Sequence, residues 1–191
     1  MKLQDRLPEG VTVDGKFYKM DFDFRNVLRM IEILDRNDLM PEAKAYKALK
    51  CLCKRPRKAG LVLEAVKALL FTGKRKEGPK VTDFVQDAGL IRAAFRQAYG
   101  IDLYRDKLHW IEFSELMAGI PEGNRYSDVI GIRARPMPEA TKWNQKEREW
   151  LLQAKADVAL DLTDKEIEKQ YKNDVDNIAA VLMAMAGGSE K

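Results

Sequence analysis

The chain has 191 residues, of which 46% are apolar and 34% are charged, and its net charge is +4. This length suits one well-buried core, or one domain with an appendage, and the composition is typical of a soluble, helix-rich protein. No window approaches about 18 consecutive apolar residues and the first ten residues contain no apolar signal segment, so neither a membrane span nor a secretory leader is expected.

The positive charge is concentrated in one part of the chain. Between residues 50 and 80, ten Lys or Arg stand against two Glu, so this part carries +8 and the remainder carries −4. Clustered cations can release counterions from phosphates, but the segment lacks interleaved aromatic residues and a recognition-helix pattern. An exposed surface that either solubilises the protein or faces a partner is therefore favoured over nucleic-acid binding. The candidate basic surface consists of Lys54, Arg55, Arg57, Lys58, Lys74, Arg75 and Lys76.

The first third of the chain predicts a hairpin followed by helices. Asp14-Gly15 lies between two short β-prone runs, and both central positions of the favoured hairpin turn need positive φ. Asp23 is the predicted N-cap of a helix that ends near residue 36. Pro41 suits the first turn of the next helix, and residues 60–71 predict a further, very apolar helix.

Residues 81–135 carry the densest mixture of aromatic and aliphatic residues at helical spacing. We predict a helix from near Thr82 to the glycine at position 100, a second from about Asp106 to Ala118, and a short third from Ser127 to about Arg133. Their shared apolar side chains are expected to form the structural core: Phe84, Ile91, Phe95, Tyr99, Trp110 and Phe113.

The last part of the chain predicts a linker and an extension. Two prolines at 136 and 138 mark the linker, and a Thr-x-x-Glu capping box at 163–166 begins a final amphipathic helix that ends near residue 186. Its apolar stripe must be buried against its own domain, a second copy or a foreign partner. The candidate partner-binding residues are Ile167, Tyr171, Val175, Ile178, Leu182 and Met185, together with Trp143 and Trp150.

These elements predict a mainly α fold. An N-terminal β-hairpin is followed by a compact multi-helix bundle, with residues 1–135 as the core domain and residues 136–191 as a linker and C-terminal amphipathic extension.

No pattern indicates catalysis, a metal site or a cofactor. The single histidine, His109, has no nucleophile at a motif spacing and is expected to be structural. Cys51 and Cys53 are two apart on a predicted helix, point in different directions, and are expected to remain reduced thiols. The glycines at 73 and 78 have the spacing of a phosphate-binding loop, but a proline occupies the position where that loop needs lysine.

Several motifs resemble a phage family. In order, they are LPEGVTVDGKFYKMDFDFRNVLRMIEIL, DFVQDAGLIRAAFRQAYGIDL, LHWIEF, ELMAGI and DVIGIRAR, which together span roughly residues 3–150. The most specific pieces are Asp83-Phe84, Asp87-Ala88, Phe95, Tyr99 to Leu103, His109-Trp110, Phe113 and Arg133. On these residues the chain resembles the gene-product-fifteen family of long-tailed phages and prophages of Gram-positive bacteria.

The resemblance implies a tail-assembly chaperone without catalytic or metal residues. Such a protein would bind the long helical tape-measure protein, help to recruit tail-tube subunits in the host cytoplasm, and leave before the virion matures. A homo-oligomer is a candidate form of it. Two alternatives stay open: a structural tail-completion or head-tail connector subunit, and a nucleic-acid-binding accessory protein that uses the basic surface.

Overall fold

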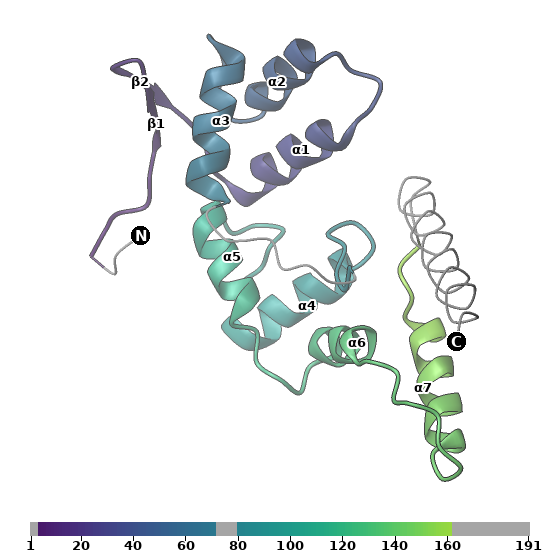
Figure 1. Ribbon diagram of the computed structural model, residues 1–191. Coiled ribbons are helices and arrows are strands. Elements are labelled where there is room, and N and C mark those ends of the chain that lie inside the picture. The colour runs from purple at the N-terminus through teal and green to yellow at the C-terminus, as the bar shows by residue number, and fades with distance from the viewer. Residues whose placement is uncertain (1–3, 72–79, 162–191) are drawn as a thin grey trace, which may run out of the picture. The chain divides into compact units, whose positions relative to one another are not determined.

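The structure, a computed structural model, describes residues 4–71 and 80–161. Within these ranges it has a two-stranded antiparallel hairpin and seven helices, so the mainly α fold class is confirmed (Figure 1). The contacts divide the chain into two compact units. Among the described residues, unit 1 holds residues 4–71 and 89–128, and unit 2 holds residues 80–88 and 129–161. This division falls earlier than the predicted boundary at residue 135, and it groups residues 80–88 with the later part of the chain.

The hairpin forms where the sequence predicts it. Strand β1 (Gly10–Val13) pairs with β2 (Lys16–Lys19), and the turn residues Asp14 and Gly15 have φ angles of 50° and 71°. Val11 is buried, and β1 packs against helix α3. A Cβ atom on Gly10 would lie 2.1 Å from the backbone oxygen of Tyr18, so this strand position requires glycine.

Three helices follow in unit 1. Helix α1 (Phe24–Asp35) begins where the Asp23 carboxylate accepts the backbone N–H of Arg25 at 3.0 Å, as the sequence predicts. Helix α2 (Pro41–Lys50) has proline in its first turn, and α3 (Ala59–Leu70) is the apolar helix. Helix α1 packs against α2, and α2 packs against α3 (Figure 1).

An aromatic cluster forms the centre of the remaining part of unit 1. Helix α4 (Ala88–Tyr99) ends before Gly100, which has a φ of 69°, and α5 is Trp110–Ala118. The Phe113 ring stacks on Phe24 at 4.7 Å, on Phe95 at 5.2 Å and on Trp110 at 5.8 Å between centroids. These four residues and Ile91 are buried, so aromatic packing joins α1, α4 and α5.

The arginine at the start of α1 adds a polar tie to this packing. The Arg25 guanidinium donates to the carbonyl oxygens of Leu103 and Asp106 at 2.8 and 2.7 Å, and it also pairs with Asp23. It thereby holds the N-terminus of α1 to the connection between α4 and α5.

The predicted core position of Phe84 is wrong. The helix expected from near Thr82 begins at Ala88, because the Asp83 carboxylate accepts the backbone N–H groups of Val85 and Gln86 and folds these residues into turns. Phe84 therefore lies outside the helix, and 37% of the residue is exposed.

Tyr99 is half-buried at the edge of the core. Its hydroxyl donates to the carbonyl oxygen of Leu116 at 2.8 Å, and its ring meets the edge of Phe95. The amphipathic character of a tyrosine suits this position, because the ring packs while the hydroxyl keeps a partner.

Two further helices complete the described chain. Helix α6 (Arg125–Ala134) starts after Asn124, whose buried side chain accepts the N–H of Ser127 at 3.0 Å. Helix α7 is Gln145–Asp157. Of the helices in residues 4–71 and 80–161, none has both the length and the apolar character that a membrane crossing requires.

Candidate partner-binding site

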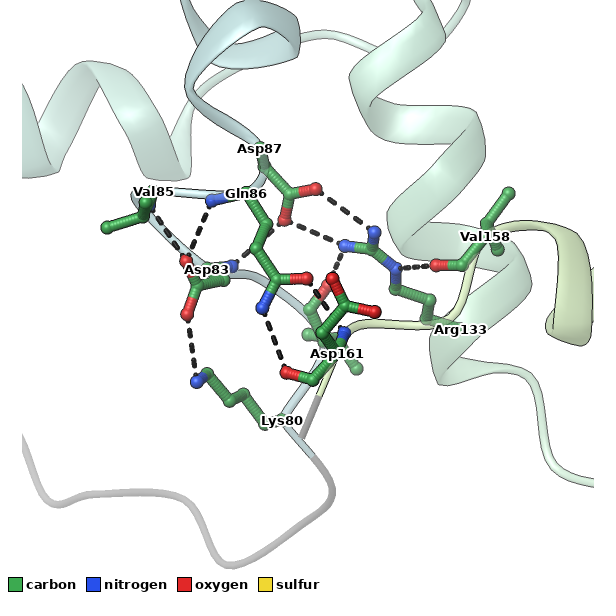
Figure 2. Close-up of polar contacts among 9 residues, drawn as sticks. Lys80, Asp83, Val85, Gln86, Asp87, Arg133, Val158 and Asp161 are labelled. Carbon is green, nitrogen blue, oxygen red and sulfur yellow. Dashed lines mark hydrogen bonds and ion pairs between the residues drawn. The ribbon is translucent and has the colours of Figure 1, made fainter. Parts of the chain in front are cut away.

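Unit 2 is organised around a buried ion pair between Arg133 on α6 and Asp87. The guanidinium Nη1 and Nη2 atoms lie 2.7 and 3.0 Å from the Asp87 carboxylate oxygens Oδ2 and Oδ1 (Figure 2). Only 11% of the arginine side chain and 3% of the aspartate side chain are exposed. This bidentate geometry uses the fork of donors that arginine has and lysine lacks.

The same arginine also donates to two backbone carbonyl oxygens. Its Nη1 atom donates to Val81 at 3.0 Å. Its Nε atom donates to Val158 at 2.5 Å (Figure 2). Lys155 on α7 donates in turn to the Arg133 carbonyl oxygen at 2.8 Å. Arg133 thus ties together residues 81–87, α6 and the end of α7, and we call these contacts the Arg133 clip.

A second aspartate orders the segment before the clip. Asp83 donates its backbone N–H to the Asp87 carboxylate at 2.9 Å, and its own carboxylate forms an ion pair with Lys80 at 2.9 Å. Burial alone raises the pKa of Asp83, but the N–H groups of Gln86 and Val85 and the Lys80 ammonium outweigh it, so this pKa lies below its ordinary value. Asp83 is therefore held ionised as part of the clip's support.

Gln86 pairs with the backbone of Asp161. Its side-chain amide donates to the Asp161 carbonyl oxygen at 2.9 Å and accepts the Asp161 N–H at 2.7 Å. This reciprocal pair copies the hydrogen bonding of two neighbouring strands. The Arg133 clip and Gln86 together hold Val158 and Asp161 beside residues 81–87 (Figure 2).

Large apolar side chains around α7 are exposed. Trp143 is 94% exposed, Trp150 is 57% exposed and Leu152 is 65% exposed, whereas Leu151 is buried. Both candidate tryptophans therefore lie on the surface of unit 2. The other candidate partner-binding residues, at positions 167, 171, 175, 178, 182 and 185, lie outside the described residues.

The structure divides the candidate basic surface. Lys54, Arg55 and Arg57 lie exposed between α2 and α3, and none of them forms an ion pair with another described residue. Lys58 instead pairs with Asp14 of the hairpin turn at 2.7 Å, and this hydrogen bond raises the pKa of its ammonium group. Positions 74, 75 and 76 lie outside the described residues. Within residues 4–71, this surface is thus reduced to three unpaired cations.

The remaining candidates for chemistry have structural surroundings. The His109 ring accepts the N–H of Ile111 through Nδ1 at 3.1 Å, which leaves Nε2 to donate to the Pro8 carbonyl oxygen at 3.1 Å. It serves as the N-cap of α5. Burial raises the pKa of the Cys51 and Cys53 thiols, which are free. The residues that the structure describes contain no cluster of His, Cys, Asp or Glu suited to a metal ion.

The sequence reasoning did not identify the Arg133 clip. Asp87 and Arg133 belong to the motifs that carry the family resemblance, but they are 46 positions apart and no helical or strand spacing joins them. The available signal was that Asp87 and Arg133, two residues of opposite charge, both belong to these motifs.

Comparison with known families identifies the class of protein. The sequence model of the family described as bacteriophage Gp15 protein matches residues 3–160. This places the chain among the structural and morphogenesis proteins of bacteriophages. Because the match covers most of the chain, the protein belongs to the bacteriophage Gp15 family, as the motifs indicated. The curated proteins and the solved structures compared with the chain contain no match.

Proposed function

We propose that this protein is a tail-assembly chaperone that binds the tape-measure protein and helps to recruit tail-tube subunits, without catalysing a reaction. It acts in the host cytoplasm and leaves before the virion is complete. Membership of the bacteriophage Gp15 family supports a role in phage morphogenesis. The step from morphogenesis to chaperone rests on the surface of unit 2.

The exposure of Trp143 and Trp150 is the observation that carries the proposal. Tryptophan is a large side chain that is highly buried on average, and at interfaces it is among the residues that contribute most to binding. Here two of the three tryptophans lie on the surface close to one helix, at 94% and 57% exposure. Such a surface supports binding of an apolar partner.

The proposed mechanism is capture of an amphipathic helix. A long helical client presents apolar residues at intervals of three and four, and these can lie against exposed aromatic side chains. Several copies of the protein bound along one client would add their affinities through effective concentration. The buried aromatic cluster of unit 1 and the Arg133 clip of unit 2 give each unit a fixed scaffold.

Mass spectrometry of purified virions tests this function against the structural alternative. A chaperone that leaves before maturation should be absent, or present far below the copy number of tail proteins. A tail-completion or connector subunit should be present in a fixed ratio to a ring of the virion. Finding the protein at such a ratio would reject the chaperone function.

A further inference from the structure

We propose that Lys54, Arg55 and Arg57, which connect α2 to α3, form a docking surface for an acidic segment of a partner protein, one that carries several Asp or Glu residues in succession. We call these three residues the basic loop. The inference goes beyond the proposed function, because it concerns a surface of unit 1 that the chaperone proposal does not use.

The segment around the basic loop carries positive charge without carboxylates. Residues 43–63 contain seven Lys or Arg and no Asp or Glu. Two of these cations have partners in unit 1, because Lys58 pairs with Asp14 at 2.7 Å and Lys44 donates to the carbonyl oxygen of Leu34 at 3.1 Å. The other five, which include the basic loop, form no ion pair with a described residue.

The carboxylates of the surrounding elements do not cancel this charge. Helix α1, which packs against α2, has two basic and two acidic residues, and β1, which packs against α3, has no charged residue. In α3, Glu64 pairs with Lys67 at 2.9 Å, and Glu42 lies at the opposite end of α2 from the basic loop. Asp21, whose N–H meets the Leu52 carbonyl oxygen, adds one carboxylate against the five unpaired cations. A carboxylate-rich partner is therefore complementary to this surface.

The backbone of the basic loop is anchored on both sides. Leu52 is buried, and its carbonyl oxygen accepts the N–H of Asp21 at 2.8 Å. On the other side, the ion pair of Lys58 with Asp14 joins the connection to the hairpin turn. Pro56 fixes one backbone angle between the two arginines. A surface that is held in place before binding loses less conformational entropy on association.

The side chains of the basic loop are available to an incoming carboxylate. All three are exposed, and none must leave an ion pair with another described residue before it binds. Two of the three are arginines, whose guanidinium groups can hold a carboxylate through two parallel hydrogen bonds.

Phosphates would also be attracted to these cations, but the surroundings favour a protein partner. Surfaces that bind single-stranded nucleic acid add aromatic side chains on which bases stack. The one aromatic residue of the 43–63 segment is Tyr46, and the Lys50 ammonium lies over its ring at 6.0 Å. Leu61, in the first turn of α3, is 60% exposed and offers an apolar contact that a protein side chain can cover.

Three labelled probes test this assignment by anisotropy titration of the full chain. The first is a synthetic peptide with successive Glu residues beside a leucine, and the second has Gln in place of each Glu. We expect the Glu peptide to bind roughly ten-fold more tightly at low salt, with the difference shrinking as salt screens the exposed charges. The third probe, a single-stranded DNA with as many negative charges, should bind more weakly than the Glu peptide, because the surface offers its bases no stacking platform.

A variant of the full chain locates the binding. Lys54→Gln, Arg55→Gln and Arg57→Gln together should weaken binding of the Glu peptide by roughly ten-fold, because three exposed charge pairs are lost. The three side chains are exposed and unpaired with described residues, so this variant should keep the circular dichroism spectrum of the original chain.

The matched control removes the same amount of charge elsewhere, through Lys107→Gln, Lys142→Gln and Lys146→Gln. These lysines are also exposed, and none of them forms an ion pair with another residue of the described ranges. Because charges far from the site are screened, the control should change the affinity by less than about two-fold.

Three kinds of result would overturn the proposal. Equal binding of the Glu and Gln peptides would remove the role of charge. An undiminished affinity of the basic-loop variant, or an equal loss in the control, would show that the basic loop is not the site. Tighter binding of the DNA than of the Glu peptide would assign the surface to nucleic acid.

Discussion

Arg133 makes four hydrogen bonds from a side chain that is 11% exposed, two to Asp87 and two to backbone carbonyl oxygens. A buried ion pair adds little net stability over an apolar pair of the same shape, because both charges must lose water. Removing one partner is different, since the other charge then stays buried without compensation. The contribution of the Arg133 clip to stability should therefore be measurable mainly when one of its two charged partners is removed.

Replacing Arg133 with Met should lower the free energy of unfolding of unit 2 by about 3 kcal/mol or more, because Asp87 and two carbonyl oxygens lose their donors. Hydrogen exchange should become faster at residues 81–87 and 158–161, and urea denaturation measures the stability.

Arg135→Met is the control for this change. Arg135 pairs with Glu147 at 3.4 Å, and about half of each side chain is exposed, so the change should stay within about 0.5 kcal/mol. Equal effects of the two substitutions would show that the clip does not hold unit 2 together.

Removal of the N-cap at His109 should cost less stability than removal of Arg133. His109→Ala should destabilise unit 1 by about 1 kcal/mol, because the N–H of Ile111 loses its acceptor. His109→Asn should recover much of this loss, since asparagine is a favoured N-cap. Thermal unfolding measures both variants, and an alanine variant as stable as the original would contradict the capping role.

Residue positions were predictable from sequence where the cause was local. The burial of Ile91, Phe95 and Phe113 follows from helical spacing, and Asp23 caps its helix through the residue two positions on. Phe84 is an exception with a local cause: the Asp83 side chain accepts backbone N–H groups of the following turn, and the sequence does not show whether such a turn continues as a helix. Arg133 could not be assigned, because its partners are distant in sequence.

At the scale of elements, two glycines have opposite roles. In β1 the position of Gly10 is closed by the backbone of the paired strand, where a Cβ atom would lie 2.1 Å from the Tyr18 oxygen. In α6 a Cβ atom on Gly131 would meet nothing within 4 Å. The first glycine is required by close approach, whereas the second lowers helix propensity without a packing reason.

Gly10→Ala should therefore destabilise the hairpin by about 1–3 kcal/mol, because the strands must separate or shift. Gly131→Ala should stabilise α6 by about 0.5–1 kcal/mol. Urea denaturation of both variants measures the difference in sign. If both substitutions were neutral, the close pairing of β1 with β2 at Gly10 would be contradicted.

Several element boundaries were predictable from a turn or capping residue. The hairpin turn, the start of α1 at Asp23, the proline in the first turn of α2 and the end of α4 before Gly100 follow from turn and capping chemistry. Helix α4 begins about six residues later than predicted. The connection to α5 runs from residue 100 to residue 109, whereas the second helix was predicted to begin at about Asp106. Both differences arise where side chains hold the backbone outside a helix.

At the scale of the molecule, the chain consists of two units that sequence composition does not separate. The prolines at 136 and 138 suggested a linker, but residues 80–88 belong with residues 129–161 through the Arg133 clip. The contacts of Arg133 with Val81 and Asp87, and of Gln86 with Asp161, reveal this grouping. The role in phage morphogenesis, by contrast, was accessible from sequence through the family motifs. The surface that we propose for the chaperone function rests on the exposure of Trp143 and Trp150 in the structure.

Co-expression with the tape-measure protein of the same phage tests the chaperone function most directly. The measured quantities are the soluble fraction of the tape-measure protein and its recovery with this protein through two purification steps. We expect the soluble fraction to rise and the two proteins to co-purify, because the exposed apolar surface covers the client. An unchanged soluble fraction, with no co-purification, would contradict the account.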